Sequence, residues 1–128
     1  MTIKLTPEES ERYFYNALCN GLGYIESGYG LELKFSSYEA QNAIKKLKDN
    51  GHNSCYEDII MQLLKDGHQI NLYDHEAEED NIIKLKDIHE KVQNAPFDRI
   101  LEMKNENDDA DTADVILQSV FFGEVIYG

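Results

Sequence analysis

The chain has 128 residues, with 25 acidic and 12 basic side chains and a formal net charge of −13 at neutral pH. This length predicts one globular domain over residues 1–128, long enough to bury roughly two thirds of the surface of the unfolded chain. The hydrophobic fraction of 41% is typical of a folded protein and argues against a disordered one. The excess of acid excludes a broad cationic surface, and with it nucleic-acid binding through the phosphate backbone.

The two cysteines, Cys19 and Cys55, lack the spacing of a zinc site or of a CxxC motif, so we expect two partly buried free thiols. The N-terminal residues do not contain the apolar core of a signal peptide. The longest uncharged, mostly apolar run, residues 115–123, is too short to span a bilayer. These features predict a cytoplasmic protein that does not contact a membrane.

The first helix is predicted by the sequence Thr6-Pro7-Glu8-Glu9, which combines a threonine cap, a proline at the first helical position and a glutamate three residues after the cap. We expect this helix to end near Asn20, because four glycines between residues 21 and 30 favour an irregular segment. Residues 31–35 alternate strictly in polarity, which predicts a short strand.

Two further helices are expected, each beginning with a Ser-x-x-Glu capping box, at Ser36 and at Ser54, and each followed by a glycine, Gly51 or Gly67. Residues 68–74 and 81–85 then predict a β-hairpin that spans an acidic loop.

After this hairpin we expect a helix over residues 86–93 and another from Pro96 onward. The second of these is expected to direct Phe97, Ile100 and Leu101 toward the core.

The final helix is predicted to be buried. Asp111 is expected to cap it, with Asp114 three residues on. From Ala113 onward the residues are apolar on nearly every face, apart from a ridge formed by Asp114, Gln118 and Ser119. This pattern is typical of a helix in the middle of a domain with one solvent-exposed seam.

The end of the chain is open to two interpretations, because Gly123 either continues the helix or breaks it before a final strand. Both endings are expected to bury Val125 and Ile126. The elements together predict an α+β fold with five or six helices packed on a small two- or three-stranded antiparallel sheet.

The negative charge is concentrated in two stretches, residues 74–80 and 106–114, which hold ten carboxylates and no lysine or arginine. If both stretches lay on one face, they could imitate the phosphate array of DNA and occupy a basic groove of another protein. The simpler interpretation is that acidic loops keep a small protein soluble. The predicted acidic binding patch consists of Asp74, Glu76, Glu78, Glu79, Asp80, Asp108, Asp109, Asp111 and Asp114.

Asp109, Asp111, Asp74 and His75 are weak candidates for ligands of a divalent cation, because Mg²⁺ and Ca²⁺ prefer hard oxygen ligands. The calcium-loop pattern fails for lack of a glycine at its sixth position and a glutamate at its twelfth. Helix capping by Asp111 and a surface position for His75 in the hairpin loop explain the same residues. We therefore predict no metal site, no cofactor and no catalytic residue.

The glycine pairs Gly21-x-Gly23 and Gly28-x-Gly30 are weak candidates for a phosphate-binding loop. They form no GxGxxG after a strand and are not followed by a GK[ST] ending. A flexible loop over the core is the favoured interpretation.

The segments NDDADTADVILQ, residues 107–118, and FFGEVIYG, residues 121–128, resemble the C-terminus of small proteins encoded by bacteriophages and prophages. YNALCNGL, residues 15–22, and CYEDII, residues 55–60, resemble segments of relatives carried by prophages of gut bacteria. This resemblance covers most of the chain in the same order. It implies a phage or mobile-element origin, and therefore a bacterial host cell, and provides no catalytic residues to carry over.

The expectation is thus a non-enzymatic acidic phage or prophage protein that binds a basic host protein, as an adaptor or antagonist. One alternative is a small divalent-metal-dependent or nucleotide-handling enzyme that uses Asp74, His75, Asp109 and Asp111. Another is a structural phage component, whose oligomeric state the sequence leaves open.

Overall fold

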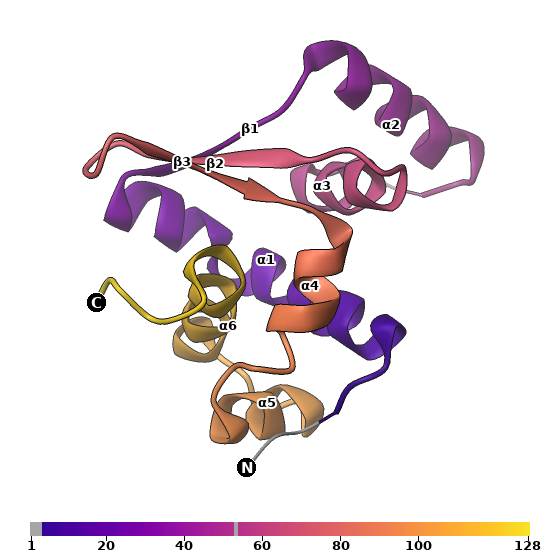
Figure 1. Ribbon diagram of the computed structural model, residues 1–128. Coiled ribbons are helices and arrows are strands. Elements are labelled where there is room, and N and C mark those ends of the chain that lie inside the picture. The colour runs from indigo at the N-terminus through magenta and orange to yellow at the C-terminus, as the bar shows by residue number, and fades with distance from the viewer. Residues whose placement is uncertain (1–3, 53) are drawn as a thin grey trace.

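The computed structural model describes residues 4–52 and 54–128 and confirms the predicted α+β fold. Within these residues, six helices accompany one three-stranded antiparallel sheet (Figure 1). The elements are α1 (Pro7–Tyr29), β1 (Leu31–Lys34), α2 (Ser37–Asp49), α3 (Tyr56–Lys65), β2 (Ile70–Asp74), β3 (Glu79–Ile83), α4 (Leu85–Lys91), α5 (Phe97–Lys104) and α6 (Ala110–Phe122).

Helix α1 is longer than predicted. The capping box at Thr6 is confirmed, since the Thr6 and Glu9 side chains each accept a hydrogen bond from the backbone N–H of the other. The predicted end near Asn20 is wrong, because the helix continues for 23 residues and ends at Gly30, which adopts a left-handed conformation with φ of 67°. Consequently three of the four glycines predicted to form a loop or a phosphate cradle, Gly21, Gly23 and Gly28, lie in a regular helix, and the fourth, Gly30, ends it.

The crossing of α1 and α6 explains one of these glycines. A Cβ atom placed on Gly21 would lie 2.8 Å from the Cβ of Ala113, so the two helices touch at this point with no room for a side chain. Further along the same contact, the rings of Phe14 and Phe121 pack edge to face with centroids 6.2 Å apart. Gly21 is therefore required by packing between helices and not by a turn.

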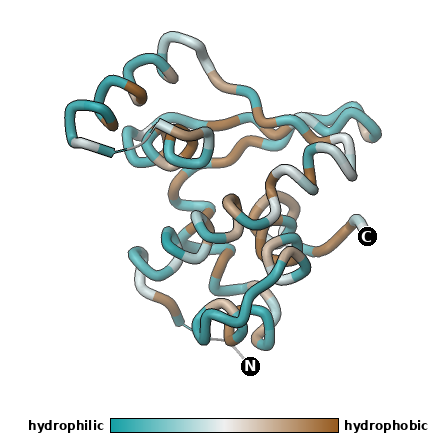
Figure 2. The backbone as a smooth tube through the Cα atoms, turned by 180° about the vertical axis from the view of Figure 1, so that it is seen from behind, coloured by the Kyte–Doolittle hydropathy of each residue, from teal (hydrophilic) through white to brown (hydrophobic). Residues whose placement is uncertain are grey.

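The sheet has the strand order β1-β2-β3. Leu31 pairs with Asp74 and Ile70 pairs with Ile83, and the pleat directs these side chains inward with Leu33 and Leu72. Helices α1, α4 and α6 lie on that side, whereas α2 and α3 lie at the far end of the strands (Figure 1). Viewed from behind, hydrophobic and hydrophilic residues alternate along the strands, and the β2–β3 turn is hydrophilic (Figure 2). The opposite, outer face of the sheet carries exposed side chains such as Glu32, Lys34 and Asp80.

Three predicted caps can be compared with the structure. The Ser36 hydroxyl accepts a hydrogen bond from the Glu39 N–H, as expected. The predicted box at Ser54 is wrong, because Cys55 is the N-cap of α3 and makes no side-chain cap bond, while its thiol lies 2.8 Å from Asp58. The final helix begins two residues earlier than expected, with Asp109 accepting from the Thr112 N–H in the role predicted for Asp111.

The predicted burial fails in two places. In α5, Ile100 is buried as predicted, but Phe97 and Leu101 are exposed by 40% and 41%. After α6, Gly123 ends the helix with φ of 79°, and the following residues form neither helix nor strand. Val125 and Ile126 each remain 48% exposed, so the expectation that both would be buried is wrong.

Both thiols are free, but each is exposed instead of partly buried. Within the described residues, no helix has both the length and the apolar character needed to cross a membrane.

Replacement of Gly21 by alanine tests the helix crossing. The added methyl group has no space beside Ala113, so we expect Gly21→Ala to lower the free energy of unfolding by about 1–3 kcal/mol. Gly23→Ala is the matched control, because it lies in the same helix with nothing within 4 Å of an added Cβ. It should raise the free energy of unfolding by up to about 1 kcal/mol through helix propensity. Urea denaturation measures both, and a stabilised Gly21→Ala variant would refute the close crossing.

Candidate functional site

Asp74, the first residue of the first acidic stretch, is buried at the end of β2 with 2% exposure. Its carboxylate accepts hydrogen bonds from the backbone N–H groups of Glu76 and Ala77, both at 3.0 Å, and from the Tyr127 hydroxyl. Burial by itself raises the pKa of this carboxyl, but the three donors outweigh burial and hold the pKa below its ordinary value. The same contact raises the pKa of Tyr127 to about 12.

Asp114, from the second acidic stretch, is buried in a similar way. Its carboxylate accepts hydrogen bonds from the Tyr29 hydroxyl at 2.8 Å and from Gln118 Nε2 at 2.7 Å. Gln118 is fully buried and also holds the C-terminal tail, because its Oε1 accepts from the N–H groups of Ile126 and Tyr127 and its Nε2 donates to the Tyr127 carbonyl. The solvent-exposed seam predicted along α6 is therefore wrong, since these polar groups are paired inside the protein.

The two acidic stretches meet at these buried residues. The rings of Tyr29 and Tyr127 stack with centroids 5.2 Å apart, so two tyrosines separate Asp114 from Asp74. Asp74 and Asp114 thus accept hydrogen bonds inside the protein and do not belong to an exposed acidic surface.

The remaining residues of the predicted patch fall in two places. Four carboxylates, which we call the hairpin acids, are exposed at the turn and start of β3; they are Glu76, Glu78, Glu79 and Asp80. At the start of α6, Asp109 and Asp111 are exposed, and the half-buried Asp108 accepts a hydrogen bond from Asn20 at 2.7 Å.

The Tyr127–Asp74 contact predicts a pH-dependent variant. Because the pKa of Asp74 lies below its ordinary value of 3.8 in the folded protein, its contribution to stability is complete above that value and is lost as the pH falls through the folded pKa. Tyr127→Phe removes one donor and should lower the free energy of unfolding by about 1–2 kcal/mol at neutral pH. The difference from the wild type should narrow in acid.

Denaturation of both proteins at neutral and acidic pH measures this difference. Tyr38→Phe is the control, because its side chain is 73% exposed and no change is expected. A loss of stability that is equal at both pH values would show that Tyr127 does not act through Asp74.

The weak metal-ligand candidates do not converge. His75 Nε2 lies 2.9 Å from Glu32 on the outer face of the sheet, Asp109 caps α6, and Asp74 is buried and accepts three hydrogen bonds within the protein. Across residues 4–52 and 54–128, no group of three or more His, Cys, Asp or Glu side chains is arranged to hold a metal ion.

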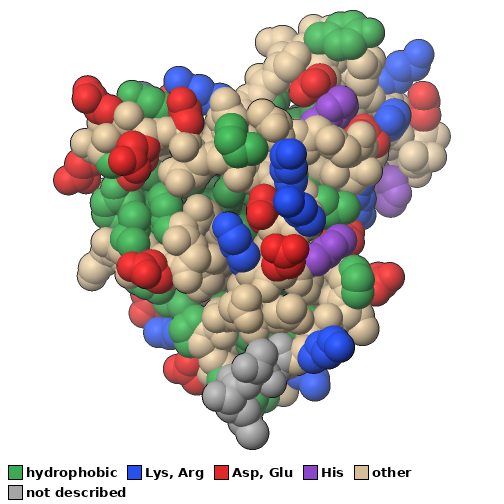
Figure 3. Space-filling view, in the orientation of Figure 1, with side chains coloured by type: hydrophobic (Ala, Val, Ile, Leu, Met, Phe, Trp, Pro, Cys, Tyr) green, Lys and Arg blue, Asp and Glu red, His purple; other side chains and the backbone are tan. Residues whose placement is uncertain are grey.

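Exposed apolar side chains gather beside the hairpin acids. Tyr24 is 57% exposed, and with Val125 and Ile126 it forms what we call the tail surface. The Tyr24 ring packs edge to face on Tyr29, and Tyr29 stacks on Tyr127. Ring contacts therefore connect Tyr24 on α1 with the C-terminal tail that carries Val125 and Ile126. On the flank where the C-terminal tail lies, Figure 3 shows hydrophobic side chains bordered above and below by acidic ones.

Sequence reasoning missed a third group of carboxylates, because it is assembled from three separate elements. Glu26 of α1, Glu32 of β1 and Glu57 of α3 lie near enough for their charges to interact, and the Leu33 backbone and Tyr56 lie beside Glu26 as polar neighbours that partly offset this repulsion. Burial, followed by repulsion from Glu32 and Glu57, raises the pKa of Glu26 above its ordinary value of 4.5.

The raised pKa of Glu26 affects stability in the opposite direction to the lowered pKa of Asp74. A carboxyl whose pKa is raised on folding favours the folded state below its ordinary pKa, and that contribution is lost as the pH rises through the folded value. Glu26→Gln should therefore raise the melting temperature at neutral pH and leave it nearly unchanged in mild acid. Glu90→Gln removes the same charge from an exposed position on α4 and serves as the control. An equal rise in both variants would assign the effect to net charge.

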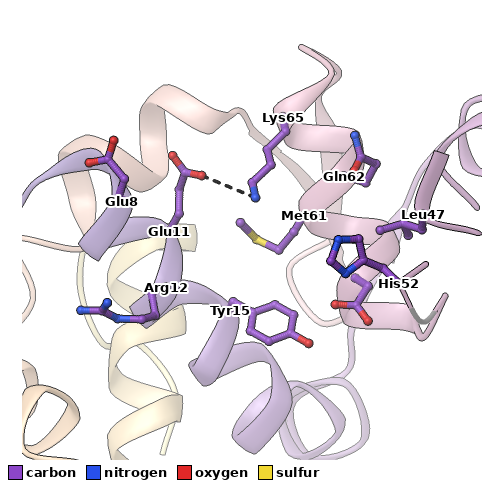
Figure 4. A pocket seen from close by; sticks show the side chains of 10 residues that line it. Glu8, Glu11, Arg12, Tyr15, Leu47, His52, Met61, Gln62 and Lys65 are labelled. Atoms are coloured by element: carbon purple, nitrogen blue, oxygen red, sulfur yellow. Dashed lines mark ion pairs between the residues drawn. The ribbon is translucent and has the colours of Figure 1, made fainter. Parts of the chain in front are cut away.

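A cavity of about 590 Å³ lies between α1 and α3 (Figure 4). Two of its charged side chains face each other, since Glu11 lies 4.0 Å from the Lys65 amine, and Glu11 also lies 2.8 Å from Nε2 of the nearby His89. Tyr15 donates a hydrogen bond to Asp58, which together with burial raises the pKa of the phenol. A tyrosine with a raised pKa is a poor proton donor at neutral pH.

In comparisons with known proteins, no family model, no curated protein and no solved structure matches this chain.

Proposed function

We propose that this is a non-enzymatic acidic protein of phage or prophage origin that binds a basic host protein, as an adaptor or antagonist. The observation that carries the proposal is the position of the hairpin acids next to the tail surface. Protein interfaces commonly combine aromatic and aliphatic residues at the centre with a polar rim, and charge complementarity speeds association and selects the partner.

The charge around the tail surface supports a basic partner. The segment 74–80 contains no lysine or arginine, and the turn it forms presents four exposed carboxylates. Glu76 and Glu79 lie close enough to Tyr127 to raise the pKa of its hydroxyl, which places them beside the tail. A partner with lysine or arginine around an apolar centre would therefore find both components in one region.

The metal-dependent alternative receives less support from the described residues. Three of its four side chains are occupied separately: Asp109 by capping, Asp74 by a buried hydrogen-bond network and His75 by a contact with Glu32, while Asp111 is exposed at the start of α6. We accordingly propose binding, and not catalysis, as the function of the acidic residues.

The test uses two variants with the same change in net charge. One neutralises the hairpin acids by Glu76→Gln, Glu78→Gln, Glu79→Gln and Asp80→Asn. The control neutralises four exposed carboxylates on α1, α2, α4 and α5 by Glu8→Gln, Asp49→Asn, Glu90→Gln and Asp98→Asn. Each protein is immobilised and exposed to bacterial host lysate, and captured proteins are eluted by steps of salt and identified.

The proposal expects a basic protein that the wild type and the control retain, that the hairpin variant loses, and that elutes as salt rises, because exposed charges are screened within about 10 Å at 0.1 M salt. An additional Ile126→Ser variant should weaken retention at every salt concentration, since it removes apolar contact. Equal retention by both charge variants, or capture of no basic protein by the wild type, would contradict the proposal.

A further inference from the structure

Strand β3 forms one edge of the sheet, because the order β1-β2-β3 gives it β2 as its only strand neighbour among the described residues. The opposite edge, β1, is partly covered by α1, since the Glu26 carboxylate lies beside the Leu33 backbone. In residues 4–52 and 54–128, no hydrogen bond from outside the sheet reaches the backbone of Asp80 or Ile82. Free N–H and C=O groups on an edge strand can pair with a strand of another molecule.

The register of the ladder identifies the free groups. The His75 N–H donates to the Gly30 carbonyl, which shows that residue 75 faces β1. Backbone groups of successive strand residues point to opposite sides, so the even-numbered residues 70–74 of β2 face β3. Their partners on β3 are the odd-numbered residues 79–83. The backbone of the intervening Asp80 and Ile82 therefore faces away from the sheet, and these two residues together offer two N–H and two C=O groups.

The side chains beside these groups are acidic at one end of the strand and apolar at the other. Ile83 is buried, so the pleat places Ile82 and Asp80 on the outer face of the sheet. Ile82 is 45% exposed, and Asp80 is exposed together with Glu78 and Glu79 before it. The free edge thus adjoins three of the four hairpin acids and one exposed aliphatic side chain.

Charge selects the occupant of this edge. A second copy of the chain would bring together two molecules of net charge −13 and place the carboxylates of two β3 strands on one short ladder. Like charges on paired strands oppose such pairing, and acidic residues on an edge commonly prevent self-association. An extended segment with lysine or arginine opposite Asp80 and an apolar residue opposite Ile82 matches both side chains. In antiparallel pairing the apolar residue comes first and the basic residue follows two positions later.

We propose that β3 binds an extended basic segment of a partner protein as a fourth, antiparallel strand of the sheet. Main-chain hydrogen bonds to Asp80 and Ile82 hold the segment, and the hairpin acids select its basic residues. The inference rests on the proposed function, because it specifies how a basic partner is held.

The probe is the peptide acetyl-Thr-Val-Thr-Lys-Thr-Lys-amide, which places its valine opposite Ile82 and its first lysine opposite Asp80. Amide hydrogen exchange of the full chain is followed by NMR. In the free protein, Asn81 should exchange slowly, because its N–H faces β2, and Asp80 and Ile82 should exchange quickly. A near-saturating concentration of the peptide should slow exchange at Asp80 and Ile82 at least fivefold.

Two methylated peptides of equal charge separate strand addition from general attraction between charges. N-methylation of the valine and the first lysine removes the N–H groups that face β3 and should weaken binding at least tenfold. N-methylation of the two threonines that flank the valine leaves those N–H groups in place, so the affinity should stay within about threefold of that of the parent peptide. Calorimetry measures all three affinities.

Ile82→Pro tests the same edge from the side of the protein. Proline removes the free N–H of residue 82 without removing a hydrogen bond to β2, and edge strands tolerate it. Peptide binding should fall at least tenfold, whereas the control Ile82→Val keeps the N–H and should bind like the wild type. A thermal melt of each variant establishes that it is folded, and the methylated peptides decide the matter if the proline variant is not.

Equal affinities of the two methylated peptides would overturn the proposal, as would a wild type that binds no peptide at millimolar concentration. A dimer that protects Asp80 and Ile82 in the absence of peptide would also overturn it, by assigning the edge to a second copy. In the lysate experiment, equal retention of the same basic protein by Ile82→Pro and Ile82→Val would overturn strand addition and leave the proposed function standing. Peptide binding with the expected methylation pattern, without capture of a basic host protein, would support strand addition and contradict the proposed function.

Discussion

The close contact of α1 and α6 is the constraint on which the rest of the structure depends. The helices touch where Gly21 meets Ala113, with a virtual Cβ distance of only 2.8 Å, and Phe14 and Phe121 extend the contact along the pair. Because a side chain at residue 21 would force the axes apart, one glycine fixes how deeply α6 enters the domain. The sheet then covers the pair through β1 and β3, which contact α1 and α6.

Once α6 is buried, its polar residues must find partners inside the protein. Gln118 is fully buried and Asp114 nearly so, and leaving their polar groups unpaired would be costly. The chain meets this demand with Tyr29 from the end of α1 and with the backbone of the tail, which folds back over α6 because Gly123 reverses its direction. The Tyr127 hydroxyl then donates a hydrogen bond to Asp74, at the end of β2 where the hairpin turn begins.

The features that the sequence predicted well are those whose chemistry is local. The capping box at Thr6, the cap at Ser36 and the alternating strands depend on neighbours a few residues away, and the structure confirms them. The length of α1 could not be read from its glycines, because the reason for Gly21 lies in Ala113 near the other end of the chain. The acidic residues could be identified from the sequence but not assigned to buried or exposed roles. Only the fold brings a tyrosine to Asp74, another to Asp114, and the carboxylates of Glu32 and Glu57 close to Glu26.

The buried network also determines how the surface is presented. Tyr127 is tied to Asp74 by its hydroxyl, to Gln118 by its backbone and to Tyr29 by its ring, so the tail and the hairpin are joined to one buried cluster. Such connections hold the apolar side chains of the tail and the nearby hairpin acids in a defined arrangement. For the proposed binding function, a preformed surface would avoid the entropy cost of ordering a loose tail and a loose turn separately. The buried carboxylates of Asp74 and Asp114 thus help to position the exposed hairpin acids, because their hydrogen bonds fix the tail and the end of β2.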